Sequence, residues 1–362
     1  MTAASDLEIL RPDDWHLHLR DGAMLQAVLR FTAEVFGRAI VMPNLVPPVR
    51  TADEATAYRS RILDCLPNGH PFVPLMTCYL TDAGRPEDIR EGHARGLFTA
   101  AKLYPAGATT NSDNGVTDVA RIAGVLAAME AVGMPLLVHG EVTDPEVDVF
   151  DREEVFIDRV LDPLRRRFPA LPVVLEHATS KVAVDYVLAT EHGLAATITP
   201  HHLMINRNAL FAGGLRPHAY CLPVAKREGD RLALRHAAVS GDVRFFLGTD
   251  SAPHPARLKE ADCGCAGIFN APTALESIAQ VFDEERALDK LEAFVSLNGP
   301  QFYSLPPNDD RIVLRRTSEP VVTDTAVAVE GGDVVQVFTA DRGLNWSIVD
   351  GRRPAAIPER RA

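Results

Sequence analysis

The sequence predicts an α/β protein of the (β/α)₈ TIM-barrel type, in which eight parallel strands alternate with helices and close on themselves. Short apolar runs are followed repeatedly by amphipathic segments, which is the pattern of successive βα units. No GxGxxG turn occurs, so the usual reason to expect an open doubly wound sheet is missing. Polar side chains able to do chemistry end most of the apolar runs, as they do at the catalytic face of such barrels.

The expected strands and helices alternate along the first 250 residues. The strands cover residues 14–19, 38–43, 72–80, 98–104, 134–140, 172–177, 194–199 and 243–250. Helical periodicity fills five of the intervals, over residues 53–66, 117–132, 152–168, 181–192 and 230–240. A hydroxyl side chain precedes three of these helices, so Thr51, Thr117 and Ser180 are the expected N-caps.

The chain length suits one barrel. At 362 residues the chain is long for an ordinary domain, but single barrels reach this size. The alternation weakens after Pro300, where short strands are expected over residues 312–316, 320–323, 325–330 and 334–340. We expect a single domain over residues 1–362, with a small C-terminal extension from about residue 304 to residue 362.

Composition and charge restrict the partners. Hydrophobic residues make up 46% and charged residues 24% of the chain, and the formal net charge is −12. This charge disfavours nucleic acid and membranes as partners, but not a small anionic substrate, because a local arginine or metal dominates at contact distance. The start of the chain does not resemble a secretion signal, and no apolar run reaches about 20 residues. The five cysteines form no disulfide-type framework, so we expect a cytoplasmic protein.

The first chemically suggestive pattern is His16-Leu17-His18 in the first expected strand. Side chains at i and i+2 of a strand share a face, roughly 7 Å apart, which suits two imidazoles binding one metal ion. In a chain with 12 histidines such a pair also arises by chance. The pair alone is therefore equally consistent with a metal site and with two histidines that bind no metal. Arg20 continues the alternation and would place a guanidinium where it could hold a carboxylate.

Three more candidate ligands end apolar runs. His139 closes LLVH and His177 closes VVLEH. Either one alone could be a hydrogen-bonded core histidine, but both together with the HxH pair favour a metal site. Asp250 ends VRFFLGTD, where its carboxylate would be buried and would need a partner such as a metal. This side chain could serve both as a ligand and as a general base.

Lys102, in FTAAKLY, lies inside an apolar run. Such a lysine is usually a snorkelling or edge-strand residue, and a protonated ammonium among metal ligands would be repelled. A neutral amine of depressed pKa can instead react with CO₂ to give a carbamate, whose two oxygens could bridge two metals. Four histidines, one aspartate and one carbamate would satisfy two zinc ions and leave room for a bridging hydroxide.

The order HxH, Lys, His, His, Asp at successive strand ends resembles the amidohydrolase superfamily. The segments DDWHLHLRDG, VMPNLVPP, TAAKLYPAGATTNSDNGV, MPLLVHGEV, ATITPHHL and FLGTDSAPH are similar to those of class II dihydroorotases. The likeness extends from about Asp13 to about Tyr303. It implies a zinc hydrolase that reversibly cyclises N-carbamoyl-L-aspartate to L-dihydroorotate in pyrimidine biosynthesis, and it implies a homodimer.

The resemblance also implies roles for individual residues. Two zinc ions per chain would be held by His16, His18, Lys102 as a carbamate, His139, His177 and Asp250. The substrate would be bound by Arg20, Asn44, Thr109, Thr110, His139, Leu222, His254 and Ala266. Thr109 and Thr110 would lie on a mobile loop over residues 106–115. A bridging hydroxide would attack the ring amide, and Asp250 would take the proton and return it to the leaving nitrogen.

Two other functions share parts of this pattern. A hydantoinase or allantoinase would use the same metal ligands, but Arg20, Asn44 and His254 make a carboxylate clamp that a neutral hydantoin does not need. A barrel that serves only as a binding scaffold is disfavoured because all six candidate ligands are present.

Other conspicuous residues have structural explanations. Cys221, Cys263 and Cys265 could suggest a further metal, but no second CxxC accompanies them, and we expect a loop on the substrate side. We expect His201 and His202 to shape a loop below the site, with the alternative that one of them faces the site.

Overall fold

Eight parallel strands form the predicted barrel in the computed structural model, which describes residues 6–340 and 342–355. The strands pair in sequence order. They are β2 (Asp14–Leu17), β3 (Arg38–Val41), β4 (Val73–Tyr79), β5 (Phe98–Leu103), β6 (Leu136–His139), β7 (Val173–Glu176), β8 (Leu194–Ile198) and β9 (Phe245–Leu247). A bridge between Leu17 and Ser251 and a hydrogen bond of 2.8 Å from the Asp250 amide to the His16 carbonyl join the last strand to the first.

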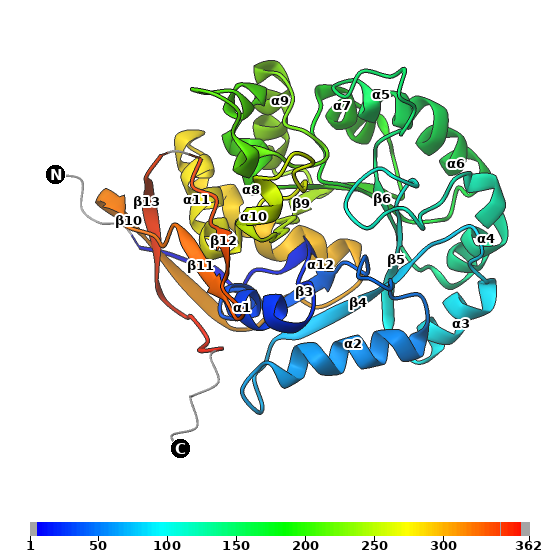
Figure 1. Cartoon of the computed structure of the whole chain (residues 1–362), viewed down its shortest axis with the longest axis horizontal. Coiled ribbons are helices and arrows are strands. Elements are labelled where there is room, and N and C mark those ends of the chain that lie inside the picture. Colours follow the sequence, from blue (N-terminus) through cyan, green and yellow to red (C-terminus); the bar gives the residue numbers. More distant parts are fainter. Residues whose placement is uncertain (1–5, 341, 356–362) are drawn as a thin grey trace.

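Helices surround the barrel (Figure 1). The longer helices are α1 (Gly22–Ala33), α2 (Ala52–Asp64), α3 (Pro86–Ala94), α4 (Ala123–Val132), α7 (Lys181–Ala189), α9 (Glu228–Val239) and α11 (Ala274–Glu284). The predicted helix over 152–168 is α5 (Arg152–Phe156) and α6 (Asp162–Arg167), joined by a π-helical segment, Ile157–Leu161. Short helices α8 (Pro200–Met204), α10 (Ala256–Lys259) and α12 (Asn298–Phe302) complete the set. In the described part of the chain no helix is long and apolar enough to cross a membrane.

Two of the three expected N-caps are confirmed. Thr51 caps α2 in a reciprocal capping box with Glu54, and the Ser180 side chain accepts from an amide in the first turn of α7. The expectation for Thr117 was wrong, because Asp118 caps the 3₁₀ turn that precedes α4. The Thr117 hydroxyl instead donates to Asp82 at 2.6 Å.

The extension after the barrel includes a strand from the other end of the chain. Strand β10 (Arg311–Val321) pairs with β1 (Asp6–Leu10) on one side and β13 (Leu344–Asp350) on the other. The two strands expected at 312–316 and 320–323 are thus one long strand. β11 (Ala326–Val329) and β12 (Asp333–Gln336) form a hairpin, and these strands lie beside α1 and α11 (Figure 1). Residues 356–362 of the expected extension lie outside the described residues.

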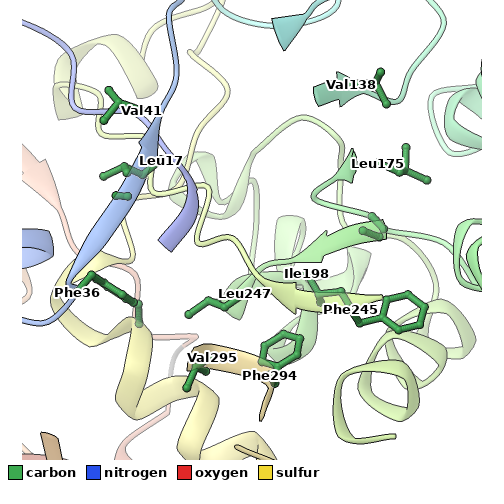
Figure 2. Close-up of a cluster of buried hydrophobic side chains, with 14 of the residues drawn as sticks. Leu17, Phe36, Val41, Val138, Leu175, Ile198, Phe245, Leu247, Phe294 and Val295 are labelled. Atoms are coloured by element: carbon green, nitrogen blue, oxygen red, sulfur yellow. The ribbon is translucent and has the colours of Figure 1, made fainter. Parts of the chain in front are cut away.

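The core has two layers. Apolar side chains between the strands and the helices form the larger one, in which Leu17, Val138 and Leu247 pack (Figure 2). A second cluster fills the barrel interior and includes Trp15, Ile40, Met42, Ala100, Leu137, Val174, Ala195, Phe246 and Tyr303. Trp15 stacks on Tyr303 with ring centroids 4.5 Å apart. The barrel interior is therefore a packed apolar core, and polar side chains are expected only at the end of the barrel away from this cluster.

Candidate active site

A polar layer lies directly above the apolar filling of the barrel. Because side chains alternate along a strand, the residue two positions after each interior residue faces the interior as well. Lys102 follows Ala100, His139 follows Leu137 and Glu176 follows Val174 in this way. All three side chains are buried, so the strand ends bring titratable groups together in a water-poor space.

Three predicted ligands form one compact group. The Nε2 atoms of His16 and His18 are 3.4 Å apart, and they lie 3.3 and 3.2 Å from the same carboxylate oxygen, Oδ1 of Asp250. All three side chains are buried. This arrangement directs two imidazole nitrogens and a carboxylate at one point, as a metal ion requires.

Glu176 is the central residue that the sequence analysis missed. Its side chain is fully buried, with Oε1 2.9 Å from Nδ1 of His16 and Oε2 in contact with the Lys102 ammonium. The signal that could have identified it is its spacing, because Glu176 follows the interior residue Val174 by two positions. Glu176 therefore connects two of the predicted ligands.

His139 and His177 lie on the other side of the same space. Their ring centroids are 4.8 Å apart, and the His177 ring is 5.0 Å from that of His16. His139 Nε2 is 2.8 Å from Oε2 of Glu141, a second buried carboxylate that the sequence analysis missed. Nδ1 of His177 is buried and has no hydrogen-bond partner among the described residues.

The hydrogen-bond partners decide which histidine nitrogens are free. Each partner below offers an oxygen lone pair, so the ring nitrogen facing it carries the proton. His18 thus donates through Nδ1 to Oδ1 of Asn44 at 2.8 Å and His139 through Nε2 to Glu141, while Nδ1 of His16 faces Oε1 of Glu176 at 2.9 Å. In the neutral form of each ring, the opposite nitrogen carries the lone pair that a metal ion would bind. Histidines oriented by such partners are typical metal ligands, so the donor set fits a metal centre.

Strong electrostatic coupling accompanies this burial. Burial lowers the pKa of Lys102, and contact with Glu176 opposes only part of the shift. Burial also lowers the pKa of His177 well below its usual value, with His139 contributing. Although burial opposes its protonation, Glu176 and Asp250 raise the pKa of His16 to about 9. A divalent metal ion bound by this cluster would displace the proton of His16. Metal binding and protonation of His16 therefore compete.

Asp250 is held as a carboxylate. Burial alone would raise its pKa, but the hydrogen bonds and charges of His16 and His18 hold the pKa of Asp250 well below its usual value. The backbone at this residue has a φ of 44°, in the left-handed region that non-glycine residues rarely adopt. Arg20 and His177 share this feature, with φ values of 60° and 44°. Strained backbone of this kind clusters at functional sites.

Arg20 and His254 form the polar end of the pocket. Arg20 donates from Nε to the Pro253 carbonyl at 3.1 Å and from Nη2 to His254 Nε2 at 2.9 Å. Burial, together with the charge of Arg20, lowers the pKa of His254 to about 2, so this imidazole is neutral. A guanidinium fixed by two neutral acceptors keeps its full charge for an anionic ligand.

A loop covers the site. The Thr110 carbonyl accepts from the Asn44 amide at 3.0 Å, and the Thr110 hydroxyl donates to the Ala266 carbonyl at 3.3 Å. Asn111 reaches back to the Asn44 carbonyl at 3.0 Å. Asn44 therefore joins His18 to the loop. The loop lies in a closed position in this structure and leaves about 20 Å³ of space inside, which is room for about one water molecule.

The structure brings the predicted site residues together. Those that line the enclosed space are His16, His18, Arg20, Asn44, Thr109, Thr110, His139, His177, Leu222, Asp250 and Ala266. Lys102 and His254 are not among the lining residues, but Lys102 contacts Glu176 and His254 contacts Arg20. Tyr104 also lines the space, which the sequence analysis did not anticipate.

A second group of possible ligands consists of His201, His202 and Cys221. The expectation of a loop here was wrong, because both histidines lie in the buried helix α8. His202 accepts from the Thr199 hydroxyl through Nδ1 and so donates through Nε2 to the Pro223 carbonyl at 3.0 Å. His201 accepts through Nδ1 from an Asn270 amide. Both rings therefore use their lone pairs in hydrogen bonds, and this group is structural.

Comparisons with known proteins agree on the family. The amidohydrolase family matches residues 13–311. A dihydroorotase of Rhizobium leguminosarum bv. trifolii (strain WSM2304) is 60% identical over 343 residues, which is 95% of this chain and 99% of that protein. The crystal structure of a dihydroorotase from Saccharomyces cerevisiae in complex with 5-fluoroorotic acid has a TM-score of 0.86 at 33% identity and covers 95% of this chain and 98% of that one. An L-hydantoinase from Arthrobacter aurescens shares the fold, with a TM-score of 0.78 at 14% identity over 97% of this chain and 87% of that one.

Proposed function

This chain belongs to the amidohydrolase family and, within it, to the dihydroorotases, and we propose that it interconverts N-carbamoyl-L-aspartate and L-dihydroorotate at a centre of two zinc ions. The reaction is a step of pyrimidine biosynthesis. One observation carries the zinc proposal: a carboxylate or an amide oxygen lies 2.8–2.9 Å from one ring nitrogen of three of the four histidines, so that in each neutral ring the other nitrogen is the one available to a metal. Hydantoins, the rival substrates, lack the carboxylate that Arg20 would bind.

The residues divide into two ligand sets. His16, His18 and Asp250 would hold one zinc ion, because their donor atoms already converge. His139 and His177 would hold the other. Lys102 is fully buried and contacts Glu176, and its lowered pKa favours the neutral amine that reacts with CO₂. The carbamate so formed would supply the anion shared by the two ions.

The chain's own residues supply the remaining chemistry. When bound, the metal pair lowers the pKa of a water molecule and polarises the ring carbonyl. Asp250, ionised at neutral pH, accepts the proton of the water that adds to the carbonyl carbon. The carbon–nitrogen bond of the ring then breaks, and Asp250 returns the proton to the departing nitrogen. In ring closure the same steps run backwards, with Asp250 first protonated.

The polar end of the pocket would bind the substrate carboxylate. Arg20 would donate to it, with His254 and Asn44 beside it, and the backbone at Leu222 and Ala266 would orient the ring. 5-Fluoroorotic acid, which the yeast relative binds, carries the same carboxylate. The Thr109–Thr110 loop would close over the ligand and exclude water, which strengthens every charge interaction inside.

The direct test is turnover of L-dihydroorotate by the purified chain, with zinc counted per chain. We expect hydrolysis of dihydroorotate, negligible hydrolysis of an unsubstituted hydantoin, and two zinc ions per active chain. Turnover of hydantoin alone would reject the proposed substrate. Activity that persists after complete removal of metal would reject the zinc centre.

We further propose that residues 1–362 form one domain, since β1 and β10 tie the start of the barrel to the extension. The resemblance supports a cytoplasmic homodimer as the working assembly. The net charge of −12 supports the absence of nucleic acid among its partners.

Glu141 offers a test of the metal centre without turnover. Changing Glu141 to alanine leaves Nε2 of His139 without its acceptor, and loss of such a partner weakens metal affinity by about 10–100-fold. Competition with a chelator, starting from metal-free protein, measures this effect. Glu141→Gln keeps an oxygen acceptor and should lose less. Equal affinity in wild type and Glu141→Ala would mean that His139 is not a ligand.

Replacing Thr109 and Thr110 together by alanine should lower turnover by about 10-fold or more, the scale of one or two lost hydrogen bonds. The double variant loses the Thr110 bond to Ala266 but keeps every metal ligand, so metal content and melting temperature should be unchanged. Thr317→Ala, in strand β10 far along the chain from the site, is the control. Unaltered kinetics in the double variant would show that the loop is only a connector.

A further inference from the structure

Lys259, the last residue of α10, is a buried cation that the proposed mechanism does not use. It is 5% exposed. Its ammonium donates to three backbone carbonyls, those of Tyr220 at 3.0 Å, Cys265 at 2.9 Å and Gly267 at 2.5 Å. An ammonium has three N–H donors, so this group is satisfied entirely by backbone.

The three carbonyls belong to two segments that form part of the pocket wall. Tyr220 lies two residues before Leu222, and Cys265 and Gly267 flank Ala266. Leu222 and Ala266 both line the enclosed space. The Gly267 amide also donates to the Tyr220 carbonyl at 3.0 Å, so the two segments are joined directly as well as through Lys259.

Gly267 brings this wall against the carboxylate end of the pocket. Its φ is +150°, and a Cβ there would lie 2.7 Å from the Ala252 carbonyl oxygen and 2.8 Å from Cδ2 of His254. Only glycine permits so close an approach. Because His254 contacts Arg20 at 2.9 Å, a displacement of the Gly267 segment would move His254 and, through it, the Arg20 guanidinium.

The charge of Lys259 acts on the same end of the pocket. It contributes to the low pKa of His254. Burial, with Arg20 among the smaller causes, lowers the pKa of Lys259 itself to about 8, and the group therefore remains mostly protonated at neutral pH. Because all three N–H groups are engaged, the ammonium can affect a ligand only by positioning the backbone and by its electrostatic potential.

We propose that Lys259 is a positioning residue that sets the affinity for the anionic substrate by fixing the Leu222 and Ala266 backbone and adding positive potential at the carboxylate end. The inference rests on the proposed function for the identity of that substrate. It predicts an effect on binding that is larger than the effect on the chemical step, because no metal ligand touches Lys259 among the described residues.

Lys259→Met keeps the apolar stem and removes the ammonium. We expect KM for L-dihydroorotate to rise by about 10-fold or more while kcat changes by less than about 3-fold, the pattern of lost uniform binding. The dissociation constant for 5-fluoroorotate, measured by calorimetry on the zinc-loaded protein, should rise by the same factor. Zinc content should be that of wild type.

Lys290→Met, at a lysine whose side chain is 47% exposed, is the matched control and should behave as wild type. If Lys259→Met does not fold, Lys259→Gln, which keeps two N–H donors without the charge, carries the same test. Unchanged KM and unchanged 5-fluoroorotate affinity would overturn the inference, as would a fall in kcat alone. If wild type and Lys290→Met also fail to turn over dihydroorotate, the proposed function fails, and 5-fluoroorotate binding still decides the role of Lys259.

Discussion

Changing Lys102 to alanine should remove both the enzymatic activity and most of the bound zinc. The side chain is fully buried and contacts Glu176, so it is no solvent-exposed lysine. Without it no carbamate forms, and the two ligand sets lose the anion they would share. Removal of one charge-stabilising donor from an active site costs about 10²–10³-fold in kcat, and loss of a bridging ligand should cost more.

The measurements are kcat/KM for dihydroorotate, zinc per chain, and intact mass under native conditions, where wild type should carry the added mass of one CO₂. Lys226→Ala is the matched control, because Lys226 is also buried but donates to the Val224 carbonyl away from the ligands. It should keep its zinc even if it is less stable. Small carboxylates added to Lys102→Ala should restore part of the activity. Near-normal turnover with two zinc ions in this variant would reject the carbamate.

Changing Arg20 to methionine should abolish most dihydroorotate turnover while the zinc remains. A hydrogen bond to a charged group contributes about 1.5–3 kcal/mol, and a bidentate contact in a desolvated pocket lies at the upper end of that range. The expected loss in kcat/KM is thus on the order of 100-fold. Burial lowers the pKa of Arg20, because a charged guanidinium is less stable away from water. A bound carboxylate would offset this loss of hydration.

Kinetics and metal analysis on the same preparation separate the two roles that Arg20 could have. Arg61→Met is the control, since Arg61 is an exposed arginine that pairs with Asp21. A parallel loss of zinc in Arg20→Met would mean that the guanidinium supports the metal ligands. Retained dihydroorotate turnover would mean that another group binds the carboxylate.

Local patterns in the sequence were enough to predict the barrel and most of the site. The strands are short and apolar, so most of them and the polar residues at their ends are visible within a few letters, as in LLVH and VVLEH. The barrel then brings the carboxyl ends of all its strands to one face. This is why residues as distant in sequence as His16 and Asp250 could be expected to meet.

The oxygen acceptors that orient the histidines required the tertiary structure. Glu176 and Glu141 are ordinary glutamates in the sequence, and only the fold shows that Glu176 faces Nδ1 of His16 and that Glu141 accepts from His139. Asn44 was expected at the substrate, but it also orients His18. Which nitrogen of an imidazole is protonated depends on a partner in three-dimensional space, and no sequence spacing specifies it.

What the sequence determined by itself was therefore the architecture and the identity of the groups at the strand ends, because both depend on short-range periodicity. The tertiary structure alone decided the pairing of β1 with β10, in which Asp6 lies opposite Arg315, and the hydrogen bonds from Lys259 to carbonyls of two separate segments, at Tyr220 and at Cys265 and Gly267. A strand edge or an ammonium can form hydrogen bonds with many partners of the same chemistry. Only the packed chain selects one of them, because burial makes every unsatisfied polar group costly.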